Sequence, residues 1–335
     1  MTIKVGINGF GRMGKLGFRI GWDCDDYAIT HINEPASDAR CHAHLLEYDS
    51  IHGHWPKEIS AANSAISVDS REVTLSAERD PRKIDWAARG VDLVVECSGQ
   101  FKKEDQLKAH FDSGAKKVLV SAPCPPPALN LVRGVNDSLY DGGQHDVVTG
   151  ASCTTNCLAP LVKVMHENLG IRHGSITTIH AITNTQTILD SPHKDLRRAR
   201  ACGESLIPTS TGSAKAIIQI FPELEGRLDG LAVRVPLANP SLTDFVFEAE
   251  RDTSIDEVNE LFRNAAAGEL KGVLGVSDRP LVSMDYRHDP RSSVVDCLST
   301  MVINQRQVKV LSWYDNEWGY MNRLMEIAAI MAKQM

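Results

Sequence analysis

The sequence has no apolar stretch that approaches the roughly 20 residues a helix needs to cross a bilayer. Its first residues, MTIKVGINGF, also lack the charged and apolar regions of a secretory signal peptide. Positive charge is in deficit, because 36 lysines and arginines stand against 43 aspartates and glutamates, for a net charge of −7. This balance argues against a broad nucleic-acid or anionic-membrane surface, although a local basic patch is compatible with it. We therefore expect a cytoplasmic protein with no membrane insertion and no nucleic-acid partner.

Paired cysteine motifs are also missing. The eight cysteines form no C-x-x-C pair, and no nearby histidine gives Cys153 or Cys157 the spacing of a zinc site. Reduced thiols are the default in a cytoplasmic chain of this size, so we predict neither disulfides nor a bound metal. Four histidines crowd one short segment, namely His42, His44, His52 and His54. Their spacing fits no single helix face, and we expect them to be structural or to lie on the surface.

The chain is long for one domain. Its 335 residues are about twice the usual length of a single domain, so two domains in one polypeptide are expected. Hydrophobic residues make up 42% and charged residues 24% of the chain, which is ordinary for a globular enzyme and disfavours a disordered one.

A glycine motif follows the first predicted strand. The apolar run from Ile3 to Ile7 leads into Gly9, Gly11 and Gly14, which are spaced as G-x-G-x-x-G. Helical spacing begins within the motif, at Met13, Leu16 and Ile20. The first glycine allows a tight turn, the second lets a pyrophosphate approach the backbone, and the third lets helix and strand pack closely. The N–H groups of the helix start then face the phosphates, although a glycine triplet alone is also compatible with a simple turn.

A carboxylate follows the second predicted strand. The β-branched run YAITHINE ends in Glu34, twenty residues after Gly14. A carboxylate at this place accepts hydrogen bonds from the ribose hydroxyls of adenosine and repels a 2′-phosphate. Glu34 therefore favours NAD over NADP, and a solvated loop glutamate is the alternative interpretation.

Two later apolar runs, VDLVVECSG and KKVLVSAP, are typical of buried parallel strands. Each closes in small residues, which places Ser98, Gly99 and Ser121 at strand carboxyl ends. Ligands bind at these ends in open α/β sheets. The first 150 residues therefore predict a doubly wound domain.

The segment GASCTTNCLAP holds two cysteines four positions apart at the start of a predicted helix. The apolar face of this helix would consist of Leu158, Leu161, Val162 and Met165. Cys153 lies at the helix N-terminus, where the dipole favours an anion. We expect its thiol pKa to fall into roughly the 3.5–7.5 range if a basic partner joins it. Cys157, one turn further on, is expected to be a small buried hydrophobe.

A nucleophilic cysteine requires a base. In the segment SITTIHAITNTQ, a β-branched strand ends in His180 and a polar loop follows. A lone histidine is compatible with a structural role, but this one follows a cysteine at a helix start and ends a strand. We therefore predict a thiol–imidazole pair of Cys153 and His180.

Five motifs occur in order and at family spacing: INGFGRMG, ASCTTNCLAP, PHKDLRRARA, IPTSTGSAKA and WYDNEWGY. Over its whole length the chain resembles phosphorylating glyceraldehyde-3-phosphate dehydrogenase. The resemblance implies a homotetramer and a fold of two domains. Residues 1–152 would form a Rossmann-type doubly wound NAD-binding domain, and residues 153–316 an α+β catalytic domain with a mostly antiparallel sheet. The C-terminal helix, 317–335, would return to the first domain through Met321, Leu324, Met325, Ala328 and Met331.

The resemblance also implies a reaction. Cys153 would attack the aldehyde of glyceraldehyde 3-phosphate, and His180 would take its proton and stabilise the oxyanion together with the Cys153 N–H. Hydride transfer to NAD would leave a thioester, which inorganic phosphate cleaves.

The resemblance assigns binding residues as well. The cofactor would be bound by Gly9, Gly11, Arg12, Met13, Gly14, Glu34, Ser98, Gly99, Ser121, Asn316 and Tyr320. Of these, Asn316 would hold the nicotinamide carboxamide, Tyr320 would lie near the ring, and Arg12 and Met13 would contact the pyrophosphate side. The substrate phosphate would lie among Thr183, Thr185, Arg198 and Arg234. The attacking anion would use Ser152, Thr154, Thr211 and Gly212, with Arg234 nearby.

Several positions depart from the common family pattern. Glu34 stands where most members of the family carry aspartate. The erythrose-4-phosphate dehydrogenase branch also has glutamate here, but that branch loses the Thr211–Gly212 element, which is intact in this chain. Gly150, the prolines at 125–127 and Ser191 also differ from common members. These features resemble the branch found in arsenate-resistance operons, in which arsenate attacks the thioester to give 1-arseno-3-phosphoglycerate.

Three interpretations therefore stay open besides the phosphate-dependent dehydrogenase. They are an arsenate-dependent one, an erythrose-4-phosphate dehydrogenase, and a non-catalytic binding paralogue. Retention of both reactive residues and of both arginines, Arg198 and Arg234, favours an enzyme.

Overall fold

The structure is a computed structural model that describes residues 2–335. The chain divides into two compact units. The first contains the described residues up to Leu131, together with Asp137–Ala151 and Met321–Met335, and the second contains Val132–Asn136 and Ser152–Tyr320.

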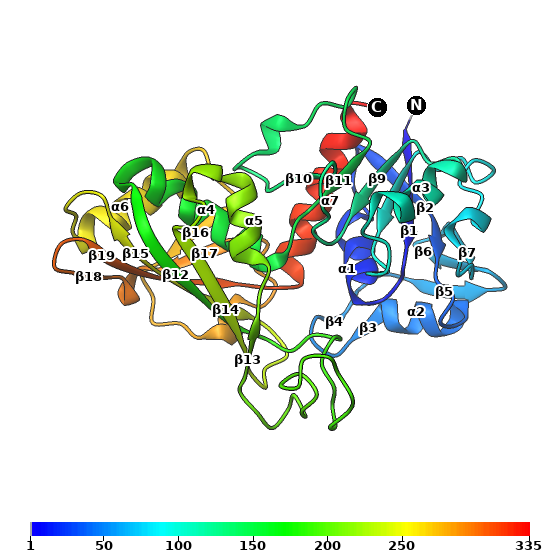
Figure 1. The fold of residues 1–335 in the computed structure, drawn as a ribbon. Coiled ribbons are helices and arrows are strands. Elements are labelled where there is room, and N and C mark those ends of the chain that lie inside the picture. The colour runs from blue at the N-terminus through cyan, green and yellow to red at the C-terminus, as the bar shows by residue number, and fades with distance from the viewer. Residues whose placement is uncertain (1) are drawn as a thin grey trace. The chain divides into compact units, whose positions relative to one another are not determined.

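The first unit is built on a nine-stranded sheet (Figure 1). In spatial order the strands are β10 (Leu129–Asn130), β11 (Val147–Thr149), β9 (Lys117–Val120), β8 (Leu93–Glu96), β1 (Ile3–Asn8), β2 (Tyr27–Asn33), β7 (Arg71–Ser76), β6 (Ala65–Val68) and β5 (Ile59–Ala62). All neighbours from β10 to β7 run parallel, and β7, β6 and β5 are antiparallel. Every residue of β8 and β9 is buried, because a parallel sheet is covered on both faces.

The chain order of these strands creates a place for a ligand. From β1 the chain runs through helix α1 (Arg12–Gly21) to β2 on one side, and it later returns to β8 on the other side of β1. Loops therefore leave the carboxyl ends of β1 and β8 in opposite directions. A crevice at such a switch point is where open α/β sheets bind ligands.

The other helices of the first unit are α2 (Ala39–Glu47), α3 (Glu104–Asp112) and most of α7 (Trp318–Lys333), with the 3-10 turns η1 (Pro81–Lys83) and η2 (Asp137–Leu139). A short pair, β3 (Tyr48–Asp49) and β4 (Gly53–His54), completes it. The apolar face predicted for α7 is buried, with Met321, Leu324, Ala328 and Met331 at 0% exposure.

The second unit is built on an eight-stranded sheet (Figure 1). In order the strands are β13 (Ile207–Ser210), β14 (Leu228–Arg234), β12 (Ile171–His180), β15 (Ser241–Ala249), β19 (Gln307–Tyr314), β17 (Ser293–Asp296) and β16 (Leu274–Ser277), and β18 (Met301–Ile303) also pairs with β19. Five of its pairings are antiparallel, and β12–β14 and β16–β17 are parallel. The predicted fold class, a Rossmann-type domain and an α+β domain with a mostly antiparallel sheet, is confirmed.

Helices of the second unit are α4 (Cys153–Leu169), α5 (Ser213–Ile220) and α6 (Ile255–Ala267), with the 3-10 turns η3 (Pro222–Leu224), η4 (Ser283–Tyr286) and η5 (Cys297–Ser299). Alternate residues of β15 are buried, as expected for a sheet with one covered face. The predicted apolar face of α4 is fully buried, with Leu158, Leu161, Val162 and Met165 at 0% exposure. Across residues 2–335, no helix is long and apolar enough to cross a membrane.

Candidate active site

A thiol and an imidazole meet in the second unit. Cys153 is the first residue of α4, and Ser152 caps this helix by accepting a 3.1 Å hydrogen bond from the Thr155 N–H. His180 is the last residue of β12, and its Nε2 lies 3.5 Å from Cys153 Sγ. The predicted pair is therefore within reach of proton transfer, and the Cys153 residue stays partly exposed.

Two contacts orient the His180 ring. Its Nδ1 lies 2.6 Å from the carbonyl oxygen of Ala181. A carbonyl oxygen only accepts, so Nδ1 carries a proton and Nε2 presents its lone pair to the thiol. Arg234, which is aligned with His180 across β12 and β14, donates to the same carbonyl at 3.0 Å and contacts Nδ1. The Ala181 contact thus favours the tautomer whose Nε2 accepts a proton from sulfur.

Burial sets the protonation of this pair. Desolvation, followed by the nearby charge of Arg234, lowers the pKa of His180 to about 3. Desolvation also raises the pKa of the Cys153 thiol, against opposing effects of Arg234 and of hydrogen bonds from Thr154 and the Cys153 backbone. The predicted lowering of the thiol pKa was therefore wrong, because burial outweighs the favourable helix start and the cation. Both shifts favour the neutral forms of the pair, a thiol and an imidazole.

Tyr314 contacts the elements that carry Cys153 and His180, and this residue was not predicted from the sequence. Its buried hydroxyl lies 2.9 Å from Thr154 Oγ1 and 2.8 Å from Thr178 Oγ1, on α4 and β12 respectively. Its ring meets that of His180 edge-on, with centroids 6.1 Å apart. Tyr314 belongs to the motif WYDNEWGY, which is the only sequence signal that could have pointed to it.

Hydroxyls and helix starts gather beside Cys153. The Thr211 hydroxyl donates to Ser213 Oγ at 3.1 Å, and Ser213 Oγ lies 3.5 Å from Ser152 Oγ. Gly212 is the residue before α5, so two helix N-termini bring their N–H groups to this cluster. Such N–H groups and hydroxyls suit a tetrahedral anion. Ser213, which links the predicted residues, was not predicted.

The other predicted anion residues form two groups. The hydroxyls of Thr183 and Thr185 are 2.9 Å apart, and neither bonds to an arginine in the part of the chain that the structure describes. Arg198 donates to Thr209 Oγ1 at 2.8 Å, and its charge helps to lower the pKa of His180, after burial and Arg234. The Nε of Arg234 is buried, and within residues 2–335 it has no hydrogen-bond partner. This nitrogen is available to a ligand.

A second candidate site lies in the first unit, at the carboxyl ends of β1, β2 and β8. It is a pocket of about 240 Å³ lined by Asn8, Gly9, Gly11, Asn33, Glu34, Pro35, Glu78, Arg79, Cys97, Ser98, Gln100 and Phe101. Four predicted residues, Gly9, Gly11, Glu34 and Ser98, are therefore brought together. The asparagines, which end strands β1 and β2, were not predicted.

The three glycines of the motif differ in the space that surrounds them. A Cβ on Gly9, whose φ is +91°, would lie 2.3 Å from Ser98 N, and a Cβ on Gly14 would lie 2.1 Å from the Gly9 oxygen. A Cβ on Gly11 would meet no atom within 4 Å. Protein packing thus requires glycine at the first and third positions, whereas at the second it leaves open space. The residues fit the pyrophosphate of a dinucleotide.

Glu34 is held at the rim of this pocket. Its Oε2 accepts from the Phe10 N–H at 2.8 Å, and its Oε1 accepts from the Ala36 N–H at 3.0 Å. Arg12 instead forms a 3.0 Å ion pair with Asp49 of β3.

The remaining predicted cofactor residues lie outside the pocket lining. Met13 and Gly14 are in α1, Gly99 occupies a turn with φ +71°, and the Ser121 N–H bonds to the Glu96 carbonyl. In the second unit, Asn316 Oδ1 accepts from the Ser241 hydroxyl at 2.8 Å, and Tyr320 is buried in α7.

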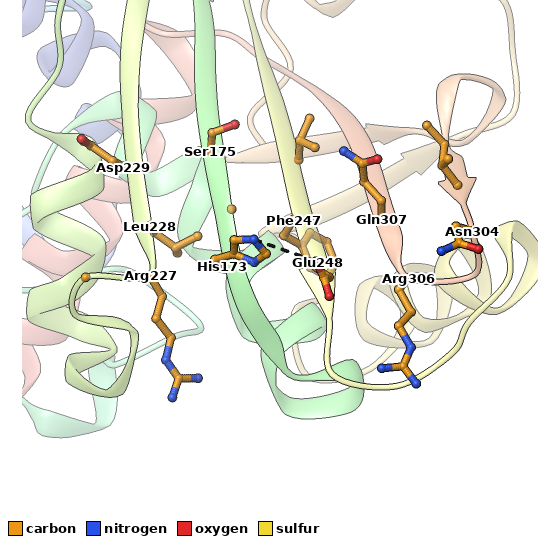
Figure 2. Close-up of a pocket in the computed structure, with 14 residues that line it drawn as sticks. His173, Ser175, Arg227, Leu228, Asp229, Phe247, Glu248, Asn304, Arg306 and Gln307 are labelled. Carbon is orange, nitrogen blue, oxygen red and sulfur yellow. Dashed lines mark ion pairs between the residues drawn. The ribbon is translucent and has the colours of Figure 1, made fainter.

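A larger hollow, of about 690 Å³, is on the sheet of the second unit and contains no predicted site residue. Figure 2 shows His173, Arg227, Asp229, Glu248 and Arg306 around it, with His173 paired to Glu248 at 3.9 Å. Its mixed charges and open shape do not suit the chemistry of a thiol. Cys153 and His180 therefore form the stronger candidate site.

The side chains of the histidine-rich segment pack against neighbouring residues or lie at the surface. His42 is buried against Phe10 and Lys15, and the rings of His44 and His54 flank the half-exposed Tyr48. No group of metal-ligating side chains that could hold an ion occurs within residues 2–335. All eight cysteines are free thiols.

Comparison with known proteins agrees with this geometry. Residues 152–316 match the family described as glyceraldehyde 3-phosphate dehydrogenase, C-terminal domain, and residues 3–104 match its NAD binding domain. The chain is 55% identical over 333 residues to glyceraldehyde-3-phosphate dehydrogenase 3 of Nostoc sp., covering 99% of both chains. It is 50% identical over 334 residues to glyceraldehyde-3-phosphate dehydrogenase of Geobacillus stearothermophilus, covering 100% of this chain and 99% of the relative.

Proposed function

The chain belongs to the glyceraldehyde-3-phosphate dehydrogenase family, and we propose that it performs the NAD-dependent oxidation of glyceraldehyde 3-phosphate through a thioester on Cys153. The observation that carries this proposal is the 3.5 Å approach of Cys153 Sγ to His180 Nε2, with the ring held by Ala181 and Arg234. A binding paralogue would have no need of an imidazole held within reach of a thiol.

In the first step, sulfur bonds to the aldehyde carbon and its proton passes to Nε2 of His180. Because thiol and imidazole are both neutral beforehand, this transfer accompanies bond formation rather than preceding it. The alkoxide that forms accepts hydrogen bonds from the new Nε2–H and from the Cys153 N–H. Arg234 beside Nδ1 opposes a lasting imidazolium, which keeps His180 ready to return the proton.

NAD, when bound, supplies the acceptor for the hydride that leaves the thiohemiacetal carbon. The carbonyl re-forms and Cys153 holds a thioester. An oxyanion then attacks this carbonyl, the carbon–sulfur bond breaks, and His180 returns its proton to the sulfur. The proton of the attacking phosphate is released to water.

The proposed cofactor site is the pocket at Gly9 and Gly11. The N–H groups at the start of α1 would face the pyrophosphate, and Glu34 would accept from the adenosine ribose. The carboxylate of Glu34 would oppose a 2′-phosphate, which favours NAD. Ser98, Gly99, Ser121, Asn316 and Tyr320 complete the proposed contacts, with Arg12, Met13 and Gly14 on the pyrophosphate side.

Two anion sites are proposed around the thiol. Thr183, Thr185, Arg198 and Arg234 would bind the substrate phosphate. Ser152, Thr154, Thr211 and Gly212 would bind the attacking anion, with support from the two helix starts at this cluster. The unpaired Nε of Arg234 supports its assignment to a phosphate.

Trapping the covalent intermediate tests the proposal. With glyceraldehyde 3-phosphate and NAD but no phosphate, one NADH per chain should form in a burst. Mass spectrometry after an acid quench should show the acyl group on the peptide that contains Cys153. No burst, or an acyl group on any other residue, would contradict the mechanism.

We further propose that arsenate serves as the attacking anion at least as well as phosphate. The resemblance of the loops at 125–127 and 150 to the arsenate-resistance branch motivates this choice. Initial rates with each anion titrated separately decide the matter. A kcat/KM for arsenate far below that for phosphate would withdraw the arsenate role and leave the dehydrogenase standing.

A homotetramer in the cytoplasm is also part of the proposal. The hollowed sheet face in Figure 2 offers charges of both signs to a second copy, and Ile188, Leu189 and Leu196 are 84%, 78% and 81% exposed. The eight free thiols suit a reducing compartment. Light scattering at micromolar concentration should give the mass of four chains, and a monomer there would contradict the assembly.

A further inference from the structure

A buried carboxylate at the edge of the parallel sheet has no part in the chemistry described above. Glu96 ends β8 and is 1% exposed. Its Oε1 accepts from the N–H and the hydroxyl of Ser98, at 2.7 and 2.5 Å. Its Oε2 accepts from Asn8 Nδ2 at 2.5 Å and from His110 Nε2 at 3.1 Å. Four donors therefore satisfy the carboxylate, and none of them is a lysine or an arginine.

Packing fixes the donor on His110. The ring is fully buried, and its Nδ1 accepts a 3.1 Å hydrogen bond from the indole N–H of Trp86. A ring nitrogen that accepts carries no proton, so Nε2 carries the proton that is donated to Glu96. Trp86 in turn lies within the hydrophobic cluster formed around β8 and β9. The core of the unit thus keeps a donor pointed at this carboxylate.

The two residues held by Glu96 lie on either side of the glycine turn. Asn8 precedes Gly9 in the chain, and the Ser98 backbone is so close to Gly9 that an added Cβ would lie 2.3 Å from Ser98 N. Asn8, Gly9 and Ser98 all line the 240 Å³ pocket. A single carboxylate therefore ties together both walls of the turn that faces the proposed pyrophosphate.

We propose that Glu96, backed by His110 and Trp86, is a positioning residue for cofactor binding. It acts through Asn8 and Ser98, which it holds in the arrangement that the dinucleotide requires before the dinucleotide arrives. Preorganisation of this kind strengthens binding, because the bound state then needs little further ordering. The inference rests on the proposed cofactor site.

Replacing the carboxylate by an amide tests the role of Glu96. In Glu96→Gln one acceptor oxygen becomes an N–H₂ group, and whichever way the amide turns, one pair of donors loses its acceptor. We expect the Kd for NAD, measured by isothermal titration calorimetry, to rise about tenfold. The kcat at saturating NAD should stay within about twofold, because Glu96 touches neither the substrate nor the thiol. An unchanged Kd, or a loss confined to kcat, would overturn the proposal.

A matched pair at His110 keeps the test valid if Glu96→Gln folds poorly. His110→Phe retains a ring but has no donor, whereas His110→Gln can place an N–H where ring Nε2 stood. We expect His110→Phe to raise the Kd for NAD several-fold, by roughly 3- to 10-fold, and His110→Gln to recover most of the affinity. A purely structural role would lower the melting temperature of both without this difference in Kd, and that result would overturn the proposal.

Two controls separate this inference from the proposed function. Asp92 stands at the other end of β8, where it accepts from the Lys4 N–H at 3.0 Å, so Asp92→Asn should leave the Kd for NAD unchanged. Glu34→Gln alters the proposed cofactor site directly. Wild-type affinity in both Glu34→Gln and Glu96→Gln would mean that the cofactor site is wrong. Weakened binding in Glu34→Gln with wild-type affinity in Glu96→Gln would mean that only the positioning role is wrong.

Discussion

The cofactor edge of the first unit and the thiol centre of the second unit differ in how completely their polar groups are paired. At the cofactor edge, both oxygens of Glu34 and of Glu96 accept hydrogen bonds from within the unit, and Asn8 Oδ1 accepts from Asn33 Nδ2 at 2.8 Å. At the thiol centre, Arg234 Nε is buried without a partner in the described chain, and the hydrogen bond of Cys153 Sγ to another side chain, His180, is a long one of 3.5 Å.

The difference fits what each region is proposed to bind. A cofactor that keeps its shape is bound best by a cradle that is already complete, because little has to be ordered on binding. A reacting centre must bind charge that develops only during the reaction, and groups already satisfied in the resting state cannot do so. Unpaired hydrogen-bonding groups are therefore expected at the reacting centre, and fully paired groups at the proposed cofactor site.

Removing the thiol should show most clearly that catalysis and NAD binding depend on different regions. Cys153→Ala is expected to lower the dehydrogenase kcat by more than about 10³-fold, because no covalent intermediate can form. NAD affinity, measured by calorimetry, should stay within about twofold, since the glycine turn belongs to the other unit. A Cys153→Ala protein that still reduces NAD with glyceraldehyde 3-phosphate would refute the assignment of the thiol.

Removing the base should have the next largest effect. His180→Gln is expected to lower kcat by roughly 10²- to 10⁴-fold, the usual contribution of a general base. The burst of NADH seen without phosphate should slow by a similar factor, while the Kd for NAD is unchanged. A variant with nearly normal burst kinetics would show that His180 only packs against the thiol.

The pH profile of the wild type sharpens this prediction. The folded pKa of His180 is lowered from 6.5 to about 3, mainly by burial, so its base form persists as pH falls and is lost only near pH 3. Between pH 5 and 8, the kcat/KM of the wild type should therefore show no inflection near pH 6.5 that is due to His180. An inflection due to His180 would be recognised because it is present in the wild type and absent in His180→Gln. Such an inflection would indicate an imidazole that titrates normally.

Local patterns predicted much of both regions. The glycine motif and Glu34 were found because strand, turn and helix signals follow one another in a short segment, and each role depends on nearby backbone. The pair Cys153 and His180 was found because one starts a helix and the other ends a strand. Predicting a strand end or a helix start needs no knowledge of distant contacts.

Features that depend on distant packing were missed. Tyr314, Ser213 and Glu96 acquire their roles from partners far away in the chain, up to 160 residues in the case of Tyr314 and Thr154. The pKa of Cys153 was predicted in the wrong direction for the same reason. A helix start is visible in the sequence, whereas the burial that raises this pKa is a property of the assembled unit.

Changing Glu34 should alter cofactor binding and cofactor choice but leave the thiol unaffected. Glu34→Ala is expected to lower the preference for NAD, expressed as kcat/KM for NAD divided by kcat/KM for NADP, by roughly tenfold. The reason is that a like charge beside the 2′-phosphate of NADP is removed. Alkylation of Cys153 by iodoacetamide, measured without cofactor, should keep its wild-type rate. Equal kcat/KM values for the two cofactors in the wild type would remove the basis of the prediction.

The smallest expected effect tests how far the reactive region extends along α4. Cys157 is fully buried one turn after Cys153, its Sγ lies 3.6 Å from Ser293 Oγ, and burial raises its pKa to about 11. It should therefore behave as packing, and Cys157→Ala should cost about 1 kcal/mol in the free energy of unfolding, from the lost sulfur and the small cavity. Urea unfolding in the presence of a reductant measures this cost, and kcat should stay within about twofold of the wild type.

Cys153→Ala is the matched control for Cys157→Ala. Cys153 is partly exposed, so its replacement should abolish activity with a smaller loss of stability. If Cys157→Ala instead lost most of its activity at unchanged stability, the reactive region would include the second turn of α4, and the separation of a reactive thiol from a packed one would be wrong.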